Sequence, residues 1–368
     1  MKREKDIVLR RIVPIALIVI LLALTLGLAI VFISRIEEEE DELPVLETVY
    51  ENWMSYINDD ALYAEVIKVS THNSAAVNVK VGSMALSYLD CQEGTIYDQL
   101  MYGVRSFDFR LVPARPNGIV YFGHGMGWSE ISVEQGLKDI RDFSDAHPGE
   151  FIEFSLGSYY GDTIHPEASV NYIKSAIQTY LEPEQYAFPS GTNFYTITMK
   201  EMRDSGKRFL ISTQWCPPEY NSGMSPGHGT WSGDYNFGSL ASGPRMYQHL
   251  YELIDSKNDK YLAPGFNRAS GEGSPDGQKV TPLAYMLYDR ENFLQLMSYL
   301  EANPHLLECI VGLSFDHATH DYVQPGRALL LNALKDGIIK PELRNEFITG
   351  LAEKMPDYTV PATYNLEQ

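Results

Sequence analysis

Cysteine is scarce in this sequence of 368 residues, which has three copies, at Cys91, Cys216 and Cys309. Structural zinc sites use cysteine and histidine ligands at short spacings, and these three positions are too widely separated to form such a motif. An odd number of thiols also leaves at least one of them unpaired within the chain. The sequence therefore predicts three small buried side chains, with one disulfide bond as the alternative.

Basic residues are also few, with 29 Lys and Arg against 49 Asp and Glu and a net charge of −20. Six of the basic and two of the acidic residues precede residue 37, so the rest of the chain carries a net charge of −24. An acidic domain repels nucleic-acid phosphates and anionic lipid head groups at long range. We therefore expect no nucleic-acid partner, and membrane proximity has to come from another part of the chain.

The sequence has one long uncharged hydrophobic run, the 23 residues from Ile12 to Ser34. A helix of this length spans a bilayer core of about 30 Å. The run exceeds the apolar core of about 7–15 residues of a cleavable signal peptide and shows no clear cleavage site. Lys and Arg precede it and "RIEEEEDE" follows it, which by the positive-inside rule puts the amino terminus in the cytoplasm.

This pattern predicts four segments in a single-pass membrane protein. Residues 1–11 form a cytoplasmic basic tail, 12–34 a transmembrane signal anchor, 35–50 a solvated acidic spacer, and 51–368 one large domain outside the cytoplasm.

Beyond the spacer, strand-like runs alternate with helix-like runs. Strands are expected within 66–70, 104–112, 118–125, 150–156, 207–213 and 308–316, and helices within 94–103, 131–146, 169–181, 199–204, 291–302, 327–337 and 341–354. Thr95 and Asp98 form a capping box, and the apolar positions of 131–146 share one helical face. Such alternation is typical of the α/β class, and a distorted (β/α) TIM-type barrel is the simplest closure, preceded by the one transmembrane helix.

The region from Cys216 to about Thr281 interrupts this alternation with clusters of Gly, Ser, Pro and Asn. Loops of this length are usually functional or disordered, and disordered segments are poor in aromatic residues. Trp215, Tyr220, Trp231 and Tyr235 therefore indicate an ordered rim over a pocket, or rings that only pack the loops down.

Polar residues collect where the expected strands end. The run "VIKVSTHNS" (66–74) turns from β-branched residues to His72, and "YFGHG" (121–125) ends at a second histidine, His124. In the strand 104–112, Asp108 and Arg110 share one face, whereas Arg105 lies on the opposite face and is expected to form a structural ion pair. At a barrel mouth, one histidine can remove a proton, the other can protonate a leaving group, and a guanidinium can hold anionic oxygens. This set fits phosphoryl-transfer chemistry.

The same stretches resemble a known family. In chain order, "STHNS", "IYDQLMYGVRSFDFRL", "YFGHG" and "HPGEFIEFSL" are similar to the X region of phosphatidylinositol-specific phospholipase C and its relatives. The similarity covers residues 53–160, and "SGKRFLIST" and "ECIVGLSFDHATHDYV" resemble the later strands more loosely. The resemblance implies a distorted (β/α) barrel in which the 2-hydroxyl of inositol attacks the phosphodiester and releases diacylglycerol and a cyclic inositol phosphate.

The resemblance also implies roles for single residues. By position, His72 is the general base and His124 the general acid. Asp316 is the candidate to orient His72 through a hydrogen bond, and Asp321 is the alternative. The implied partner is a phospholipid, in this family an inositol-containing one.

The chain departs from the calcium-dependent members of the family at two ligand positions, which here are Arg110 and Gly157. Calcium takes six to eight oxygen ligands, and Asn73 with Asp108 supplies too few. We expect no metal cofactor, with Arg110 neutralising the phosphate as in the metal-independent bacterial members. Calcium is the alternative, because Asn73 stands where those bacterial members usually have Asp and calcium users have Asn.

Secreted bacterial members use a basic residue after the fourth strand and another after the fifth, whereas this chain has Gly157 and Thr213 in those regions. The head group is therefore open, and a catalytically silent surface protein that binds phosphoinositides or glycans is one rival hypothesis. A glycerophosphodiester phosphodiesterase is another, although that family resembles "HRG" followed by a Glu-x-Asp metal pair, where this chain has "THNS" and "DFR". His317 and His320 could form a metal pair, but hydrogen bonding at the pocket edge is the favoured interpretation.

Overall fold

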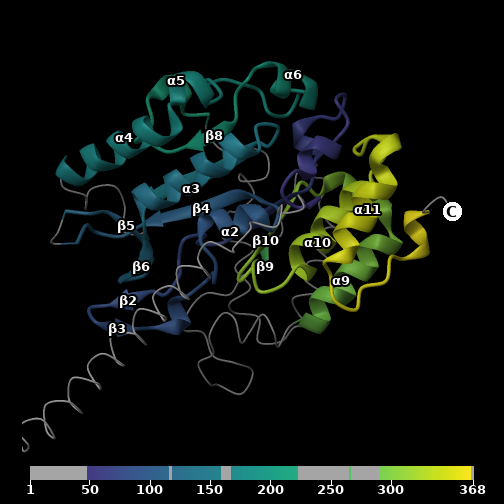
Figure 1. Cartoon of the computed structure of the whole chain (residues 1–368), viewed down its shortest axis with the longest axis horizontal. Helices are drawn as coiled ribbons and strands as arrows, with labels where there is room; N and C mark the ends of the chain where they lie inside the picture. Colours follow the sequence, from purple (N-terminus) through teal and green to yellow (C-terminus); the bar gives the residue numbers. More distant parts are fainter. Residues whose placement is uncertain (1–47, 116–117, 159–166, 223–264, 267–289, 366–368) are drawn as a thin grey trace, which may run out of the picture. The chain divides into compact units, whose positions relative to one another are not determined.

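The computed structural model describes residues 48–115, 118–158, 167–222, 265–266 and 290–365 (Figure 1). The predicted basic tail, the anchor at 12–34 and residues 35–47 of the spacer lie outside these ranges, as do Trp231 and Tyr235 of the expected rim. Within the described ranges, no helix combines the length and apolar character needed to cross a membrane.

The strands and helices largely follow the expected order. The strands are β1 (Lys68–Thr71), β2 (Lys80–Val81), β3 (Met84–Ala85), β4 (Val104–Leu111), β5 (Tyr121–His124), β6 (Gly127–Ser132), β7 (Ile152–Ser158), β8 (Phe209–Ser212), β9 (Gly265–Phe266) and β10 (Gly312–Phe315). The α-helices are α2 (Ile96–Met101), α3 (Val133–Ala146), α4 (Glu167–Leu181), α5 (Pro183–Tyr186), α6 (Met199–Asp204), α9 (Arg290–Ala302), α10 (Val323–Leu330) and α11 (Arg344–Glu353).

The centre of the fold is a parallel sheet with the strand order β8-β7-β4-β1-β10-β9. It curls into a half-barrel, and in the part of the chain that the structure describes, β8 and β9 do not pair with each other. The predicted α/β class is confirmed. Of the predicted barrel, the described residues show one curled half, made of parallel strands.

The prediction of an alternating strand and helix order is wrong after β4. β5 runs antiparallel to β4, with Leu111 opposite Phe122, and β6 runs antiparallel to β5. β2 and β3 extend this antiparallel arm. The link from β4 to β5, residues 112–120, is shorter than the dozen or so residues that a parallel crossover needs.

Two predicted helix signals are confirmed. Both halves of the Thr95 and Asp98 capping box are formed at the start of α2. In α3 the predicted apolar face is fully buried, and the helix begins at Val133 because the two residues before it end β6. Helices α3 and α4 lie side by side on one side of the sheet, while α10 contacts β1 and β10 (Figure 1).

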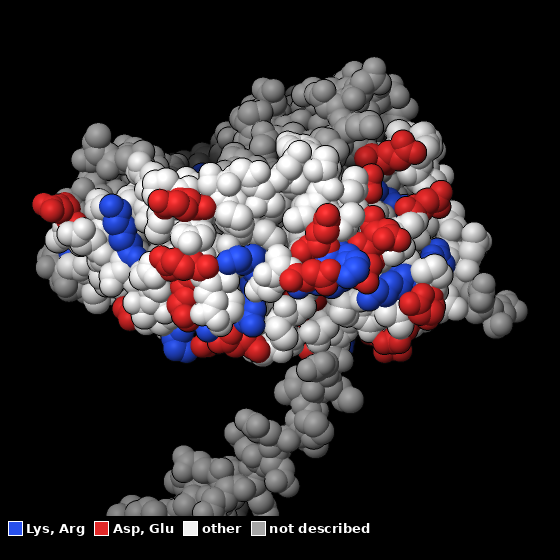
Figure 2. Space-filling model, turned by 90° about the horizontal axis from the view of Figure 1, so that it is seen from above, with Lys and Arg blue, Asp and Glu red and all other residues white. Residues whose placement is uncertain are grey.

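The exposed face of these helices carries charges of both signs. Figure 2 shows Lys and Arg side chains lying among more numerous Asp and Glu side chains. On α3 and α6, ion pairs one helical turn apart include Arg141 with Asp145 at 2.7 Å and Lys200 with Asp204 at 2.6 Å. Pairs of this kind contribute only about 0.3–0.5 kcal/mol each, so the stability of the domain rests on its core.

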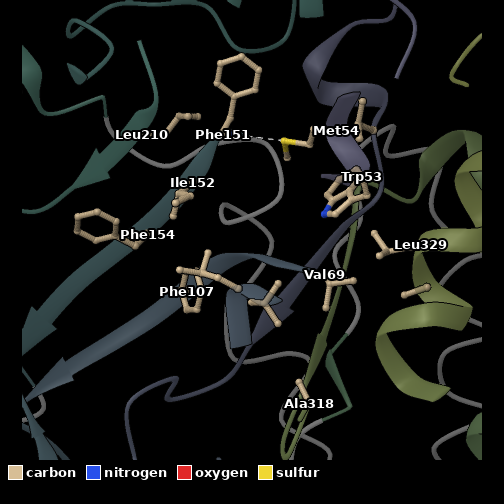
Figure 3. Packing of buried hydrophobic residues seen from close by; sticks show 14 of the residues in the cluster. Trp53, Met54, Val69, Phe107, Phe151, Ile152, Phe154, Leu210, Ala318 and Leu329 are labelled. Carbon is tan, nitrogen blue, oxygen red and sulfur yellow. Dashed lines mark hydrogen bonds between the residues drawn. The ribbon is translucent and has the colours of Figure 1, made fainter. Parts of the chain in front are cut away.

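The core lies where the parallel strands meet the chain before β1 (Figure 3). The Trp53 indole N–H donates to the carbonyl of Gly103 at 3.0 Å, and the Phe151 N–H lies 3.2 Å from the Met54 sulfur. Arg105 is fully buried and pairs with Glu150 at 2.7 Å, which confirms the predicted structural ion pair.

The residues just before the predicted domain pack against it. Residues 48–50 were assigned to the acidic spacer, but Tyr50 is fully buried and its hydroxyl donates to the carbonyl of Leu351 at 2.9 Å. Val49 is also buried. These apolar groups gain more from packing against α11 than from solvation, so residues 48–50 belong with the compact unit that continues to the end of the chain.

Candidate active site

His72 and Asp316 follow two neighbouring strands and lie side by side at the edge of the sheet. The parallel register of β1 and β10 pairs Thr71 with Phe315, so the next residue of each strand is brought into contact. His72 Nδ1 lies 2.9 Å from Asp316 Oδ1. Because a carboxylate only accepts hydrogen bonds, the proton of a neutral imidazole belongs on Nδ1 and the lone pair on Nε2. Asp321, the alternative partner, pairs with Arg290 instead.

Asn73 joins the end of β1 to β4. Its φ of 44° is left-handed, a conformation that Asn tolerates better than most side chains. Its backbone N–H donates to Asp108 Oδ2 at 3.2 Å, and the Ser74 hydroxyl accepts from the N–H of Asp108 at 2.8 Å. The buried Nδ2 of Asn73 has no hydrogen-bond partner among the described residues, and such a donor is expected to meet a water or a ligand oxygen.

Asp108 and Arg110 form an ion pair on the inner face of β4. Arg110 donates from Nε at 2.9 Å and from Nη2 at 2.6 Å to Asp108 Oδ2. Burial alone would raise the pKa of Asp108, but the guanidinium charge and its hydrogen bonds hold that pKa at about 2. Asp108 is therefore ionised, and the Arg110 side chain, 31% exposed, is oriented at the mouth of the site.

His124 reaches the same mouth from the antiparallel arm. It ends β5, is 3% exposed, and its Nδ1 lies 2.8 Å from the carbonyl of Leu89. A carbonyl can only accept, so Nδ1 carries a hydrogen and Nε2 is the nitrogen that gains or loses a proton. The rings of His72 and His124 are nearly perpendicular, with centroids 6.4 Å apart. The structure thus brings the two predicted histidines together, although β5 does not run parallel to β1.

The protein environment keeps His124 neutral. Burial, together with the nearby guanidinium of Arg110, lowers the pKa of His124 to about 4 despite the hydrogen bond to Leu89. A general acid has to be protonated before it acts. The role predicted for His124 therefore requires an anion in the site that raises this pKa.

Two residues of this site were not found from the sequence. Cys91 is fully buried, and its Sγ lies 3.6 Å from His124 Nδ1. The Gln92 amide donates to the carbonyls of His72 and Phe315, both at 3.0 Å, and so ties the ends of β1 and β10 together. Both lie in the loop "DCQEG", whose only sequence signal is its place just before the capping box of α2.

Cys91 and Cys216 are free, buried thiols, as predicted, and they do not form the alternative disulfide. The side chain of Cys309 lies outside the described part of the chain.

In the part of the chain that the structure describes, the oxygen donors beside Arg110 are fewer than a calcium ion takes. Asp108 Oδ2 already accepts two bonds from Arg110 and one from Asn73, and Gly157 offers no side chain. A calcium ion takes six to eight oxygen ligands. His320 Nδ1 lies 3.3 Å from Glu93 Oε2, within hydrogen-bond distance, whereas His317 Nδ1 lies 3.6 Å from Glu93 Oε1, beyond that distance. The predicted hydrogen bonding is therefore seen for His320 only.

Of the two positions that depart from the family pattern, Gly157 has open space beside it and Thr213 is buried. Gly157 is paired with Arg110 in the register of β4 and β7, and a Cβ added there would meet nothing within 4 Å. Thr213, after β8, is 5% exposed and its hydroxyl accepts from the N–H of Trp215 at 3.4 Å. No cationic group stands at either position.

Comparison with solved structures shows that the chain has the fold of the phosphatidylinositol-specific phospholipases C, as the sequence resemblance predicted. The enzyme from Listeria monocytogenes superimposes with a TM-score of 0.56 at 19% identity, over 77% of this chain and 98% of that one. A variant of the enzyme from Staphylococcus aureus superimposes with a TM-score of 0.54 at 18% identity, over 82% of this chain and 95% of that one.

No protein-family model matches the sequence, and no curated protein matches it either. At these identities the likeness establishes the fold. The activity has to be argued from the site.

Proposed function

We propose that this protein is a phosphoric diester hydrolase of the phospholipase C type, which cleaves the head group of an inositol-containing phospholipid through a cyclic phosphate. The observation that carries the proposal is the pair of histidines at one mouth, 6.4 Å apart between ring centroids, with a guanidinium beside them. The fold supports a phosphodiesterase, since the solved structures that share it are phospholipases C named for phosphatidylinositol.

In this proposal His72 is the general base. With its Nδ1 bonded to Asp316, Nε2 takes the proton of the inositol 2-hydroxyl as that oxygen forms its bond to phosphorus. Asp316 is a positioning residue, which holds the ring and stabilises the imidazolium that forms. A well-placed base of this kind contributes about 10²–10⁴ in rate.

His124 is the general acid. As the bond from phosphorus to the glycerol oxygen breaks, the proton on Nε2 passes to that oxygen, which leaves as diacylglycerol, while inositol keeps the cyclic phosphate. The substrate phosphate carries a negative charge next to a histidine whose pKa is lowered to about 4, and this charge favours the protonated form. Substrate binding therefore prepares the acid.

Arg110 takes the place of a metal ion. Its guanidinium, oriented by Asp108, can donate to the non-bridging oxygens of the phosphate and stabilise the charge that builds up there. The buried amide of Asn73 supplies one more donor. The lack of a metal requirement is part of this proposal.

The same proposal includes a membrane anchor at 12–34, with the catalytic domain outside the cytoplasm. It rests on the charge and hydropathy pattern of the sequence.

A catalytically silent protein that binds phosphoinositides or glycans is the second candidate. The open space at Gly157 and the neutral state of His124 favour it, because neither helps to hold a substrate phosphate. A glycerophosphodiester phosphodiesterase is disfavoured, since Asp108 is paired with Arg110 rather than with a second carboxylate.

The full chain in detergent, incubated with mixed micelles of phosphatidylinositol or phosphatidylcholine, tests the proposal. We expect water-soluble phosphate to be released from phosphatidylinositol. Saturable binding of the micelles without release from either lipid would support the silent binding protein, and release from phosphatidylcholine alone would refute the inositol assignment.

A further inference from the structure

Three side chains at the candidate active site also form a cluster of metal-binding groups. Cys91, His72 and Asp316 each offer one metal-binding atom, and these three atoms lie within 4.8 Å of one another. Within the part of the chain that the structure describes, no other three His, Cys, Asp or Glu side chains meet so closely. His124 borders the group, with Nδ1 3.6 Å from the Cys91 sulfur.

The donor set selects among cations. A thiolate, an imidazole and a carboxylate are ligands for zinc and similar borderline-soft ions, whereas calcium and magnesium take oxygen ligands. Three protein ligands also leave the fourth tetrahedral position open to water or to a substrate oxygen. The residues are distant in sequence, and the β1 and β10 register and the loop before α2 bring them together.

The group is buried but lies at the mouth. Cys91 is fully buried and Asp316 is 2% exposed, while His72, at 9% exposed, has the most access to solvent. Burial raises the pKa of the Cys91 thiol well above its usual value, so this cysteine is protonated in the absence of a cation. A thiol in that state is a poor nucleophile, which makes an independent redox role for Cys91 unattractive.

We propose that Cys91, His72 and Asp316 form a reversible site for a zinc-class divalent cation, and that the bound cation inhibits the phosphodiesterase. Binding replaces the thiol proton of Cys91, which passes to solvent, with a bond from sulfur to the metal. His72 binds through Nδ1, whose proton moves to Nε2, so both the hydrogen bond to Asp316 and the Nε2 lone pair that the general base requires are lost. The inhibition rests on the proposed function, whereas the cation site does not.

Cobalt(II) is the probe of choice, because a bond from thiolate sulfur to cobalt gives a charge-transfer band in the near ultraviolet. The full chain in detergent, titrated with cobalt, is expected to develop this band to one equivalent, and zinc should bleach it. Absence of the band would overturn the site, whatever the activity of the protein.

Paired variants assign the sulfur. A Cys216→Ser and Cys309→Ser double variant keeps Cys91 as its one thiol and should retain the band. Cys91→Ser should lose it. A band that survives in Cys91→Ser would overturn the assignment of Cys91 as the sulfur ligand. Loss of the band from the double variant, with an unchanged circular dichroism spectrum, would overturn it as well, so one well-folded variant is sufficient for the test.

Activity measurements distinguish cation binding from inhibition of the phosphodiesterase. Zinc should suppress phosphatidylinositol cleavage, a chelator should restore it, and Cys91→Ser should need at least about tenfold more zinc for half-inhibition, as expected for the loss of a metal ligand. Cleavage that is insensitive to zinc while the cobalt band is present would refute the inhibition. If no lipid is cleaved at all, the proposed function and the inhibition both fail, and the cobalt band alone decides the cation site.

Discussion

The two histidines are held by different kinds of acceptor. His72 is bonded to the carboxylate of Asp316, which stabilises a positive charge on the ring. His124 is bonded to the neutral carbonyl of Leu89, which fixes the tautomer but compensates less for burial. This asymmetry suits a base that becomes charged during the reaction and an acid that ends it neutral.

Removing either imidazole tests these assignments. His72→Ala and His124→Ala should each lower kcat for phosphatidylinositol cleavage by about 10²–10⁴, because each removes one proton-transfer group. Steady-state kinetics in mixed micelles measures this, with His305→Ala as the control, since His305 is exposed in the segment before β10. Near-normal turnover in either site variant, with the control unchanged, would remove that histidine from its role.

The protonation of His124 should depend on bound anion. We expect its NMR titration to show a pKa of about 4 in the free protein and a higher pKa with a soluble inositol phosphate diester bound. Since the ligand then favours the protonated ring, the affinity for this diester should rise as pH falls toward 4.

The control for this titration is His124→Ala. If the affinity depends on pH equally in this variant, another group is responsible. A pKa of His124 that does not move on ligand binding would contradict the coupling of substrate binding to protonation.

Arg110 should not be replaceable by lysine. Arg110→Lys keeps the positive charge but loses the planar guanidinium, which can donate two parallel hydrogen bonds. The loss of one charge-assisted hydrogen bond, about 1.5–3 kcal/mol, corresponds to a decrease of about 10–150-fold in kcat/KM. Arg141→Lys on the surface of α3 is the control and should change little. Wild-type kcat/KM in Arg110→Lys would mean that a point charge is sufficient.

The sequence was informative about those site residues that lie on strands or directly after them. His72, Asp108 and Arg110 could be placed because strand alternation and strand ends determine where side chains point. Cys91 and Gln92 could not be placed, because their loop follows no period and its position depends on contacts with residues distant in the sequence.

The antiparallel arm of β5 and β6 positions His124, and a glycine makes it possible. A Cβ on Gly123 would lie 2.1 Å from the carbonyl oxygen of Gly127 and 2.7 Å from a Val112 methyl. The group that approaches Gly123 so closely is the backbone of β6. Gly125 serves the turn itself, with a φ of 55°.

Gly123→Ala should therefore disturb the arm. Overpacking of this kind costs about 1–3 kcal/mol in the free energy of unfolding, and the strand that carries His124 has to shift. Urea unfolding and turnover measure the two effects, with Gly149→Ala as the control because a Cβ there meets nothing within 4 Å. Unchanged activity and stability in Gly123→Ala would show that the hairpin adapts without displacing His124.

The strand at β5 was predicted, but its direction could not be derived from the strand pattern alone. The pattern of "GIVYFGHG" shows that a strand forms, but the same pattern suits a parallel or an antiparallel neighbour. The better signal was the length and composition of the link "VPARPNGIV", which is too short for a crossover and contains two prolines and an Asn-Gly pair, a sequence typical of turns.

For the molecule as a whole, charge and anchoring have to be considered together. The chain carries a net charge of −20, and acidic side chains outnumber basic ones on the face in Figure 2. Phosphatidylinositol is itself anionic, so a domain with this charge is repelled from the bilayers that contain its proposed substrate. The proposed anchor at 12–34 would hold the domain near such a surface despite this repulsion.

The most direct test of the central claim is a phosphorus NMR spectrum of the reaction with phosphatidylinositol, recorded with and without a chelator. Metal-free catalysis by His72, His124 and Arg110 predicts the signal of a cyclic inositol phosphate in both spectra. Loss of that signal with the chelator would contradict the assignment of Arg110 in place of a metal ion. A spectrum without a cyclic product in either condition would contradict the proposed reaction itself.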